Sequence, residues 1–266
     1  MALFPVHNYF VYNNQLLPVS QFIPSENEGG IYEVLRVVEG VPLFLEEHLV
    51  RFYHSAEIAN KKIRFSPEQI HKFLINLIQK NRVFEGNILI SCKINLKAFF
   101  VPHKYPTTKM FETGIKCGVL KAERENPNAK VFQTSVRERA NKLIEEKGYY
   151  EVLLIDHFGR ITEGSRSNIF FVKDDELITP PGNEVLLGIT RGKTIILARE
   201  LNIPFKEKDV YYDDLNQYHA AVITGTSPKI LPVKKIENVK FDAADVIVRR
   251  LISAYNLLIQ QYINKR

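Results

Sequence analysis

The sequence predicts a fold of mixed α-helices and β-strands that is divided into two domains. Strand-like and helical patterns alternate in the first third of the chain, and both patterns resume after a polar, proline-containing stretch at residues 102–109 that has the composition of a linker. A chain of 266 residues is long enough for one large domain or two small ones. We therefore expect a small first domain, residues 1–108, and a larger second domain, residues 114–266.

The strands of the expected first domain are marked by runs of β-branched and aromatic residues. Residues 8–15 read as a strand that ends in an Asn-Asn turn. Residues 30–38 read as a second strand that closes at a Glu-Gly hairpin signal, and residues 87–100 as one further strand.

Two helices are expected between these strands. The first begins near Glu46 and buries apolar residues at helical spacing. The second begins at Ser66, where Ser66 can cap the helix, Pro67 suits the first helical position and Gln69 can complete a capping box.

The second half of the chain shows the same mixture of elements. Apolar runs predict strands at residues 115–120, 150–155, 169–172, 177–178 and 220–223. Helical spacing predicts helices at residues 136–148, 194–201 and 243–262. No internal repeat is present, so a solenoid or propeller is not expected.

Composition limits the function classes. The chain is 45% hydrophobic and 25% charged with a net charge of +6, which is ordinary for a globular enzyme. No basic stripe is interleaved with aromatic residues, so we expect no nucleic-acid partner. Without a signal-peptide pattern or an apolar run of membrane-span length, we expect a cytoplasmic protein with no membrane partner. Cys92 and Cys117 lie in apolar runs without metal-ligand spacing, so we expect buried reduced thiols and no metal.

Three short motifs in the second half of the chain carry the chemistry. They are Thr-Glu-Gly-Ser-Arg-Ser-Asn at residues 162–168, Leu-Gly-Ile-Thr-Arg at residues 187–191 and Thr-Gly-Thr-Ser at residues 224–227. Each lies at a turn beside an apolar run. Gly164 allows a flat ring to approach the backbone closely, and amides ahead of a helix favour an anion.

In this order the motifs resemble those of the fold-type IV enzymes that use pyridoxal 5'-phosphate. That family contains the branched-chain aminotransferases, the D-amino-acid transaminases and aminodeoxychorismate lyase. The resemblance covers residues 32–233. It implies an α+β, two-domain fold with the cofactor bound between the domains, and a homodimer in which the neighbouring subunit contributes to the pocket.

The resemblance assigns most of the cofactor's contacts. Glu163 is expected to face the pyridine nitrogen, where a carboxylate keeps the ring protonated. The amides of Ile189 and Thr190, with the Thr190 hydroxyl, are expected to bind the phosphate together with Thr226. Arg51, in Glu-Glu-His-Leu-Val-Arg-Phe, matches the family's phosphate arginine, although its pattern alone places it on the polar side of a helix.

The expected Schiff-base lysine is Lys130. Counting back without gaps from the motif at residues 148–151 reaches this residue, and the apolar residues after it suit a strand that enters a pocket. The Asn-Tyr or Leu-Asn pair that usually follows the lysine is absent, and Gln133 occupies that region. Lys142 is a competitor by proximity, but it lies among glutamates in a helical pattern typical of a solvated face.

The group that binds the substrate's carboxylate is less well marked. Tyr32 matches an active-site tyrosine of the D-amino-acid transaminases. Those enzymes also carry an arginine on the strand read at residues 88–95, and its position falls on Ile94 here. Arg137, Arg139 and Lys229 are the candidates for the missing contact, and Ser227 is a further expected contact of the substrate.

The family's chemistry leaves several functions open. The first expectation is an aminotransferase that moves an amino group between an amino acid of the branched-chain or D-amino-acid type and a 2-oxo acid. The alternative is aminodeoxychorismate lyase, in the synthesis of 4-aminobenzoate for folate, and a further alternative is a homologue that binds the cofactor without turnover. The lysine and the glutamate are common to the first two, so these residues do not separate them.

Overall fold

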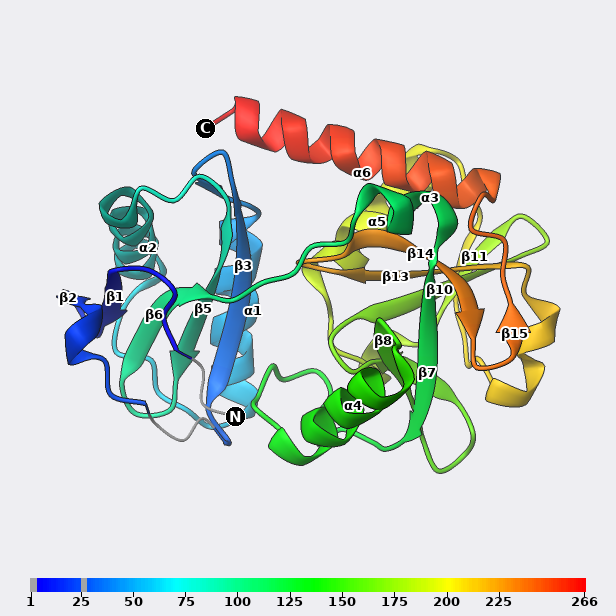
Figure 1. Ribbon diagram of the computed structural model, residues 1–266, viewed down its shortest axis with the longest axis horizontal. Coiled ribbons are helices and arrows are strands. Elements are labelled where there is room, and N and C mark those ends of the chain that lie inside the picture. The colour runs from blue at the N-terminus through cyan, green and yellow to red at the C-terminus, as the bar shows by residue number, and fades with distance from the viewer. Residues whose placement is uncertain (1–3, 25–27) are drawn as a thin grey trace. The chain divides into compact units, whose positions relative to one another are not determined.

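The computed structural model describes residues 4–24 and 28–266 (Figure 1). These residues form two compact units. The first unit is drawn from Met1–Lys104, Ala129–Gln133 and Ile259–Arg266, and the second from Tyr105–Asn128 and Thr134–Leu258. The expected domains were two uninterrupted segments of sequence, whereas two short segments from the later sequence pack within the first unit.

A six-stranded antiparallel sheet forms the centre of the first unit, with the spatial order β2-β1-β6-β5-β3-β4. Its strands are β1 (Tyr9–Tyr12), β2 (Gln15–Pro18), β3 (Ile31–Val38), β4 (Val41–Pro42), β5 (Gly86–Cys92) and β6 (Leu96–Val101). The strand expected at residues 87–100 is therefore wrong as a single element. It is the hairpin of β5 and β6, in which Cys92 pairs with Leu96 across the turn.

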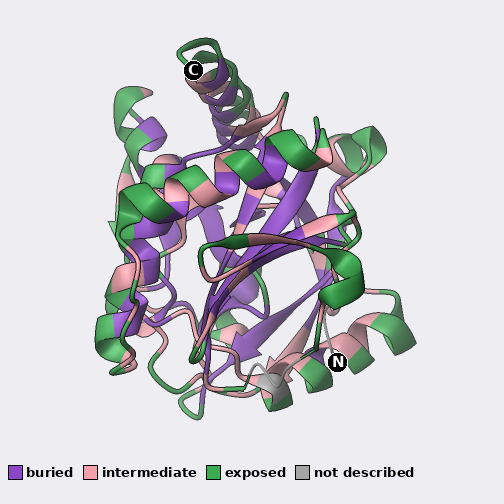
Figure 2. Ribbon diagram, turned by 90° about the vertical axis from the view of Figure 1, so that its left-hand side faces the viewer, coloured by how far each residue is buried: buried purple, intermediate pink, exposed green. Residues whose placement is uncertain are grey.

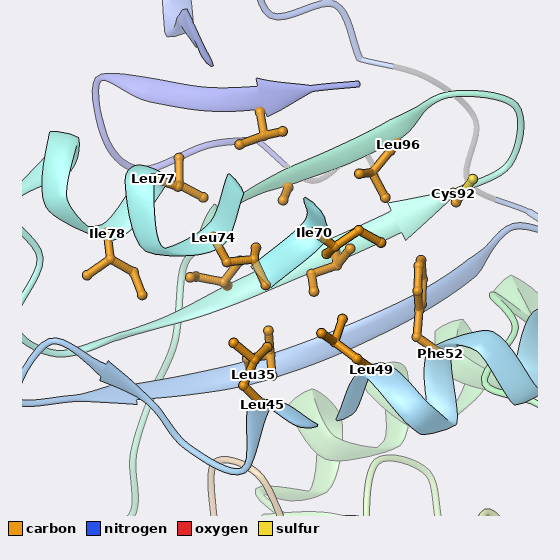
Figure 3. Packing of buried hydrophobic residues seen from close by; sticks show 14 of the residues in the cluster. Leu35, Leu45, Leu49, Phe52, Ile70, Leu74, Leu77, Ile78, Cys92 and Leu96 are labelled. Carbon is orange, nitrogen blue, oxygen red and sulfur yellow. The ribbon is translucent and has the colours of Figure 1, made fainter. Parts of the chain in front are cut away.

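The helices α1 (Leu45–Ile58) and α2 (Pro67–Asn81) pack on one face of this sheet. Figure 3 shows apolar side chains of both helices gathered against the strands, among them Leu49, Phe52 and Leu74. The capping box expected at Ser66 is confirmed. The Gln69 amide donates to the Ser66 hydroxyl at 3.3 Å, and the Ser66 amide donates to the Gln69 side chain at 2.8 Å.

The other face of the sheet carries a second apolar cluster. Side chains on successive strand residues point to opposite faces. Ile31, Leu35 and Val37 of β3 consequently join the core under the helices, whereas Tyr32 joins a cluster with Phe10 on the opposite face. This alternation puts Tyr32 and Glu33, which are neighbours in the sequence, on different sides of the sheet.

A larger mixed sheet forms the second unit, with the order β12-β11-β10-β13-β14-β7-β8-β9, and β15 pairs with β14 beside this path. Its strands are β7 (Ile115–Lys121), β8 (Glu151–Ile155), β9 (Ile161–Gly164), β10 (Asn168–Lys173), β11 (Glu176–Thr179), β12 (Phe205–Glu207), β13 (Ala220–Gly225), β14 (Lys229–Ile236) and β15 (Val239–Lys240). Strand β14 was not expected from the sequence. It contains Pro232, which cannot donate a backbone hydrogen bond and usually argues against a central strand.

The remaining helices are α3 (Thr108–Thr113), α4 (Thr134–Lys147), α5 (Ile189–Glu200) and α6 (Val246–Asn264). Two expectations are corrected here. The stretch at residues 102–109 expected as a linker leads into α3. Thr107 caps this helix, and its hydroxyl accepts from the Met110 amide at 3.3 Å. The helix expected at residues 194–201 begins at Ile189, directly after Gly188.

Burial follows the sheets and the inner sides of the helices (Figure 2). The strands are largely buried, while the helices carry exposed residues along their length. Cys92 and Cys117 are both buried and free. Among the described residues, no helix combines the length and the apolarity that crossing a bilayer requires.

Candidate active site

The segment around Lys130 is held between β3 and α1 of the first unit. The Tyr32 amide donates to the Lys130 carbonyl at 3.0 Å, and the Phe132 amide donates to the Gly30 carbonyl at 2.9 Å. The Lys130 amide donates to the hydroxyl of Ser55, a fully buried residue of α1, at 3.0 Å. The backbone of Lys130 is therefore fixed from two sides by a strand and a helix.

The Lys130 side chain lies over an aromatic pair. Its ammonium is 4.7 Å from the centroid of the Tyr32 ring, a distance at which a cation is attracted to the face of the ring. Tyr32 stacks on Phe132 with the ring centroids 4.1 Å apart. The structure thus brings the expected lysine and the expected substrate tyrosine together.

Arg51 is buried, and it is paired with a carboxylate. The sequence pattern placed it on the polar side of a helix, and this is wrong because α1 packs that side against Glu33 of β3. The Arg51 guanidinium donates to both oxygens of Glu33, each at 2.7 Å, and His48 Nδ1 lies 2.8 Å from the same carboxylate. Bidentate contact of this kind fixes the plane of the guanidinium.

The electrostatics of this cluster favour an ionised carboxylate beside a neutral imidazole. Burial alone would raise the pKa of Glu33, but the Arg51 charge and the hydrogen bonds from Arg51 and His48 outweigh burial and hold that pKa far below its usual range. Burial lowers the pKa of His48 and exceeds the opposing effect of Glu33, and the positive charges of Arg51 and Lys130 act in the same direction. Lys130 is therefore close enough to this cluster to influence its protonation.

Glu163 lies at the end of β9 in the second unit, and its side chain is buried. One carboxylate oxygen accepts from the Leu186 amide at 3.1 Å, and the other accepts from Arg124 at 3.0 Å. A carboxylate has about four lone-pair sites, so both contacts are compatible with a further N–H donor.

The rest of the motif at residues 162–168 explains how Glu163 is held. The hydroxyls of Ser165 and Ser167 donate to the buried Glu151 carboxylate at 2.6 and 2.8 Å. A Cβ added at Gly164 would lie 2.2 Å from the Ser167 hydroxyl and would displace it from Glu151. The serines and the glycine therefore serve to fix the strand end that carries Glu163.

The turn before α5 is hydrogen-bonded to the motif at residues 162–168. The Leu186 carbonyl accepts from the Asn168 side chain and from the Gly188 amide, each at 2.8 Å. Helix α5 then starts at Ile189, and no side chain caps it. The first amides of a helix have no partner within the helix, and together with the helix dipole they favour an anion. Thr190 is buried there, with its hydroxyl 3.3 Å from the Tyr255 hydroxyl.

A buried hydroxyl without a partner lies on the strand next to this turn. Thr224 Oγ1 is buried and has no hydrogen-bond partner among the residues that the structure describes. Thr224 pairs across the sheet with Asn168, the residue that holds the Leu186 carbonyl. Thr226 and Ser227 follow in the turn between β13 and β14, and both are half-buried.

The candidate residues thus fall into two groups, one in each unit. Tyr32, Arg51 and Lys130 belong to the first unit, and Glu163, Arg137, Ile189, Thr190, Thr226 and Ser227 belong to the second. Arg137 is half-buried on α4. Within the described parts of the chain, no group of three or more His, Cys, Asp or Glu side chains is arranged to hold a metal ion.

Sequence reasoning missed several residues that hold these groups in place. Glu33 and His48 were available as signals, because Glu33 is adjacent to Tyr32 and His48 lies one helical turn before Arg51. Ser55 and Arg124 gave no such signal, since their partners Lys130 and Glu163 are 75 and 39 residues away in the sequence.

Comparison with known proteins places the chain in a family. The family model of class IV amino-transferases matches residues 30–236. A D-alanine aminotransferase of Staphylococcus epidermidis is 29% identical, with 88% of this chain and 89% of the relative covered. A protein of Rickettsia conorii named a probable branched-chain-amino-acid aminotransferase is 28% identical, with 79% of this chain and 78% of the relative covered.

Solved structures agree on the fold. The branched-chain amino acid aminotransferase of Escherichia coli superposes with a TM-score of 0.82 at 22% identity and covers 95% of this chain and 94% of its own. The branched-chain aminotransferase of Thermobaculum terrenum, solved with pyridoxal phosphate, also gives a TM-score of 0.82, at 21% identity, and covers 96% of this chain and 95% of its own. The expected α+β fold of fold-type IV is confirmed by these likenesses.

Proposed function

Because the chain belongs to the class IV aminotransferases, we propose that it moves an amino group between an amino acid and a 2-oxo acid, with Lys130 as the amine that holds the cofactor. The cofactor of this family is pyridoxal 5'-phosphate. When bound, it supplies an aromatic ring that accepts electron density as the substrate's Cα loses a proton.

The observation that carries this proposal is the setting of Lys130. Its backbone is fixed by Ser55 and by β3, and its ammonium lies over the Tyr32 ring. With the cofactor bound, the Lys130 amine would also serve as the base that accepts the proton from the substrate's Cα.

The polar groups of the second unit support a role in binding the two ends of the cofactor. Glu163 offers a buried, anchored carboxylate for a ring nitrogen. The uncapped start of α5 at Ile189 and Thr190 offers amides for a phosphate, and the Thr224 hydroxyl offers a donor that lacks a protein partner. Arg51 and Thr226 are proposed as the further phosphate contacts.

The substrate is proposed to be an amino acid of the branched-chain or D-amino-acid type. Relatives named for each type match most of the chain at similar identity. This similarity supports both substrate types equally. Tyr32, Arg137 and Ser227 are the proposed contacts of the substrate.

We also propose a homodimer in the cytoplasm. The large apolar side chains that are exposed on the first unit, at Ile23, Val50 and Ile94, are candidates for contacts with a second subunit. The two free cysteines suit a reducing compartment. Sedimentation velocity of the purified protein tests the assembly, and fractionation of cells that make the protein tests its location.

The experiment that tests the function follows the cofactor's visible absorption during a half-reaction. The holoenzyme is mixed separately with L-leucine and with D-alanine. The band should fade with at least one donor as the corresponding 2-oxo acid forms, and added 2-oxo acid should restore it. Lys130→Ala should lack both the band and the reaction, whereas Lys142→Ala, at a lysine whose side chain is 75% exposed on α4, should retain them.

Three results would contradict the proposal. A band that no amino donor changes indicates a homologue that binds the cofactor without turnover. Release of pyruvate from aminodeoxychorismate, without transamination, indicates the lyase. Full activity in Lys130→Ala shows that the lysine is misassigned.

A further inference from the structure

The loop at residues 122–128 is held at both of its ends within the second unit. Near its start, the Glu123 carboxylate accepts from the His157 amide at 2.7 Å. At its end, the Asn128 side chain donates to the Val185 carbonyl at 2.7 Å. The loop is therefore anchored to two separate parts of the second unit.

Both oxygens of Glu163 are bound through this loop. Arg124 of the loop donates to one oxygen at 3.0 Å. The other oxygen accepts from the amide of Leu186 at 3.1 Å, and Leu186 follows Val185, the residue that Asn128 holds. The side chains of Arg124 and Glu163 are 12% and 3% exposed, so this ion pair is largely removed from water.

A second buried carboxylate beside the same motif is held in a different way. Glu151 accepts from the hydroxyls of Ser165 and Ser167 at 2.6 and 2.8 Å, and from two backbone amides at 2.8 and 3.2 Å. All four of these donors are neutral. Neutral donors are thus sufficient to hold a buried acid in this region, and the cation beside Glu163 indicates a further role.

A cation beside a carboxylate affects where a shared proton resides. A carboxylate and a pyridine nitrogen can share one proton, and the carboxylate's affinity for that proton falls when a positive charge is nearby. The proton then stays on the nitrogen, and the ring in this form accepts electron density most readily. The hydrogen bond between the two groups is also about twice as strong when it joins a cation to an anion.

We propose that Arg124 is a positioning residue for the cofactor and acts through Glu163. The guanidinium keeps this carboxylate ionised and fixed in place, so that the carboxylate binds a protonated ring nitrogen. The proposal rests on the proposed function, in which Glu163 binds that nitrogen. Arg124 should therefore determine how strongly the protein prefers a cofactor with a ring nitrogen to one without it.

The test compares two probes, pyridoxal 5'-phosphate and its 1-deaza analogue, in which a C–H group replaces the ring nitrogen. Both probes keep the aldehyde and the phosphate. Equilibrium dialysis of the full chain, freed of cofactor, gives a Kd for each probe at neutral pH. The Kd of the analogue divided by the Kd of pyridoxal phosphate measures the preference for the nitrogen. Arg124→Gln should lower this ratio about 10-fold, the difference between a charged and a neutral hydrogen bond.

Three further variants control the result. Arg124→Lys keeps the charge and should keep the ratio within a fewfold of the wild type. Arg249→Gln removes another arginine of the second unit, which donates to the Phe111 and Glu112 carbonyls at 2.6 Å, and it should leave the ratio unchanged. Glu163→Gln should lower the ratio at least as far as Arg124→Gln does.

The double variant of Arg124→Gln with Glu163→Gln tests whether one residue acts through the other. Its ratio should equal that of Glu163→Gln alone, because Arg124 has no carboxylate left to influence. This variant buries no unpaired charge, so it keeps the proposal testable even where Arg124→Gln alone does not fold. A further fall of the ratio in the double variant would contradict an action through Glu163.

The remaining outcomes separate this proposal from the proposed function. An unchanged or higher ratio in Arg124→Gln would overturn the role of Arg124. An equal rise of both Kd values would overturn it as well, because it would show that Arg124 supports only the fold. Binding requires no amino donor, so a protein that shows the expected ratios and transaminates no amino acid would uphold the role of Arg124 and reject the proposed reaction.

Discussion

Glu33 is the charged residue around which the first unit's polar core is organised. It is fully buried, and Arg51 and His48 satisfy its oxygens. Removing one partner from a buried pair of charges is costly, because the other charge is left without compensation. The cluster should therefore act as a unit and tie α1 to β3.

The cluster predicts how stability depends on pH. The folded-state pKa of His48 is lowered by burial, so its contribution to stability is present above its ordinary value near 6.5 and is lost as the pH falls below that value. Glu33 adds a second loss below its ordinary value near 4.5, since its folded-state pKa is lowered as well. The free energy of unfolding, measured with urea, should therefore fall between pH 7.5 and pH 5.5.

The His48→Gln variant should show a smaller fall in the free energy of unfolding between pH 7.5 and pH 5.5, because the substitution removes the titrating group. His54→Gln, at a largely exposed histidine of the same helix, should leave the fall unchanged. An equal fall in all three proteins would show that His48 is not the group responsible.

Ser55 supports the lysine through its backbone. Ser55→Ala leaves the Lys130 amide without its acceptor, which should cost about 1–3 kcal/mol of stability and weaken retention of the cofactor. Equilibrium dialysis against pyridoxal phosphate measures the retention. Ser66→Ala removes the cap of α2 at a similar cost of about 1 kcal/mol and should leave the cofactor's Kd unchanged. Equal Kd values in the two variants would reject a positioning role for Ser55.

Among single residues, the sequence predicts those candidates that lie in a short local motif. Arg51, Glu163 and Thr190 each lie in a short pattern that can be recognised without the fold. Ser55 could not be found in this way, because a serine on a helix has many ordinary roles and its partner is 75 residues away. The resemblance predicted Lys130 by spacing, and the structure adds the contacts that hold its backbone.

Helix α5 is the element on which the proposed phosphate site depends. Its start was expected several residues too late, because Gly188 and Gly192 are poor helix formers and obscure the first turn. Tertiary contacts compensate, since Asn168 and Glu163 fix the turn that leads into the helix. Helix α2 was expected correctly at its start because its capping signal is local.

Two glycines of this region give a matched test. A Cβ at Gly188 would lie 2.1 Å from the Asn168 side-chain oxygen, so Gly188→Ala must displace the Asn168 side chain that holds the Leu186 carbonyl. We expect a loss of about 1–3 kcal/mol and a higher Kd for pyridoxal phosphate. Gly192→Ala meets nothing within 4 Å and should stabilise the helix by up to about 1 kcal/mol with an unchanged Kd. Thermal unfolding measures the stability of the two variants, and dialysis measures their Kd for pyridoxal phosphate. A Gly188→Ala protein with the wild-type Kd would show that this turn does not form the phosphate site.

The order of residues in the sequence does not show which segments belong to which unit. Residues 129–133 and 259–266 pack within the first unit although segments of the second unit separate them from the rest of the first unit in the chain. Hydrophobic periodicity identifies an element and its buried face, but it does not say which distant element covers that face. Mixed helices and strands in two parts could therefore be predicted, whereas the assignment of these segments depended on contacts between residues far apart in sequence.

Cofactor binding should be visible as stability of the whole molecule. A ligand that binds only the folded state adds about 2.7 kcal/mol at a concentration 100 times its Kd. Urea unfolding with and without pyridoxal phosphate should show this difference in the wild type. At the same concentration of pyridoxal phosphate, the free energy of unfolding of Glu163→Ala should increase less than that of the wild type. An increase equal to that of the wild type would show that Glu163 does not contact the cofactor.

Reduction of the holoenzyme with borohydride, followed by peptide mapping, tests the central claim most directly. The reagent joins the cofactor permanently to the lysine that holds it. The pyridoxyl group should be found on the peptide that contains Lys130 and on no other. A label on Lys142 or on any other lysine would contradict the assignment from which the proposed function proceeds.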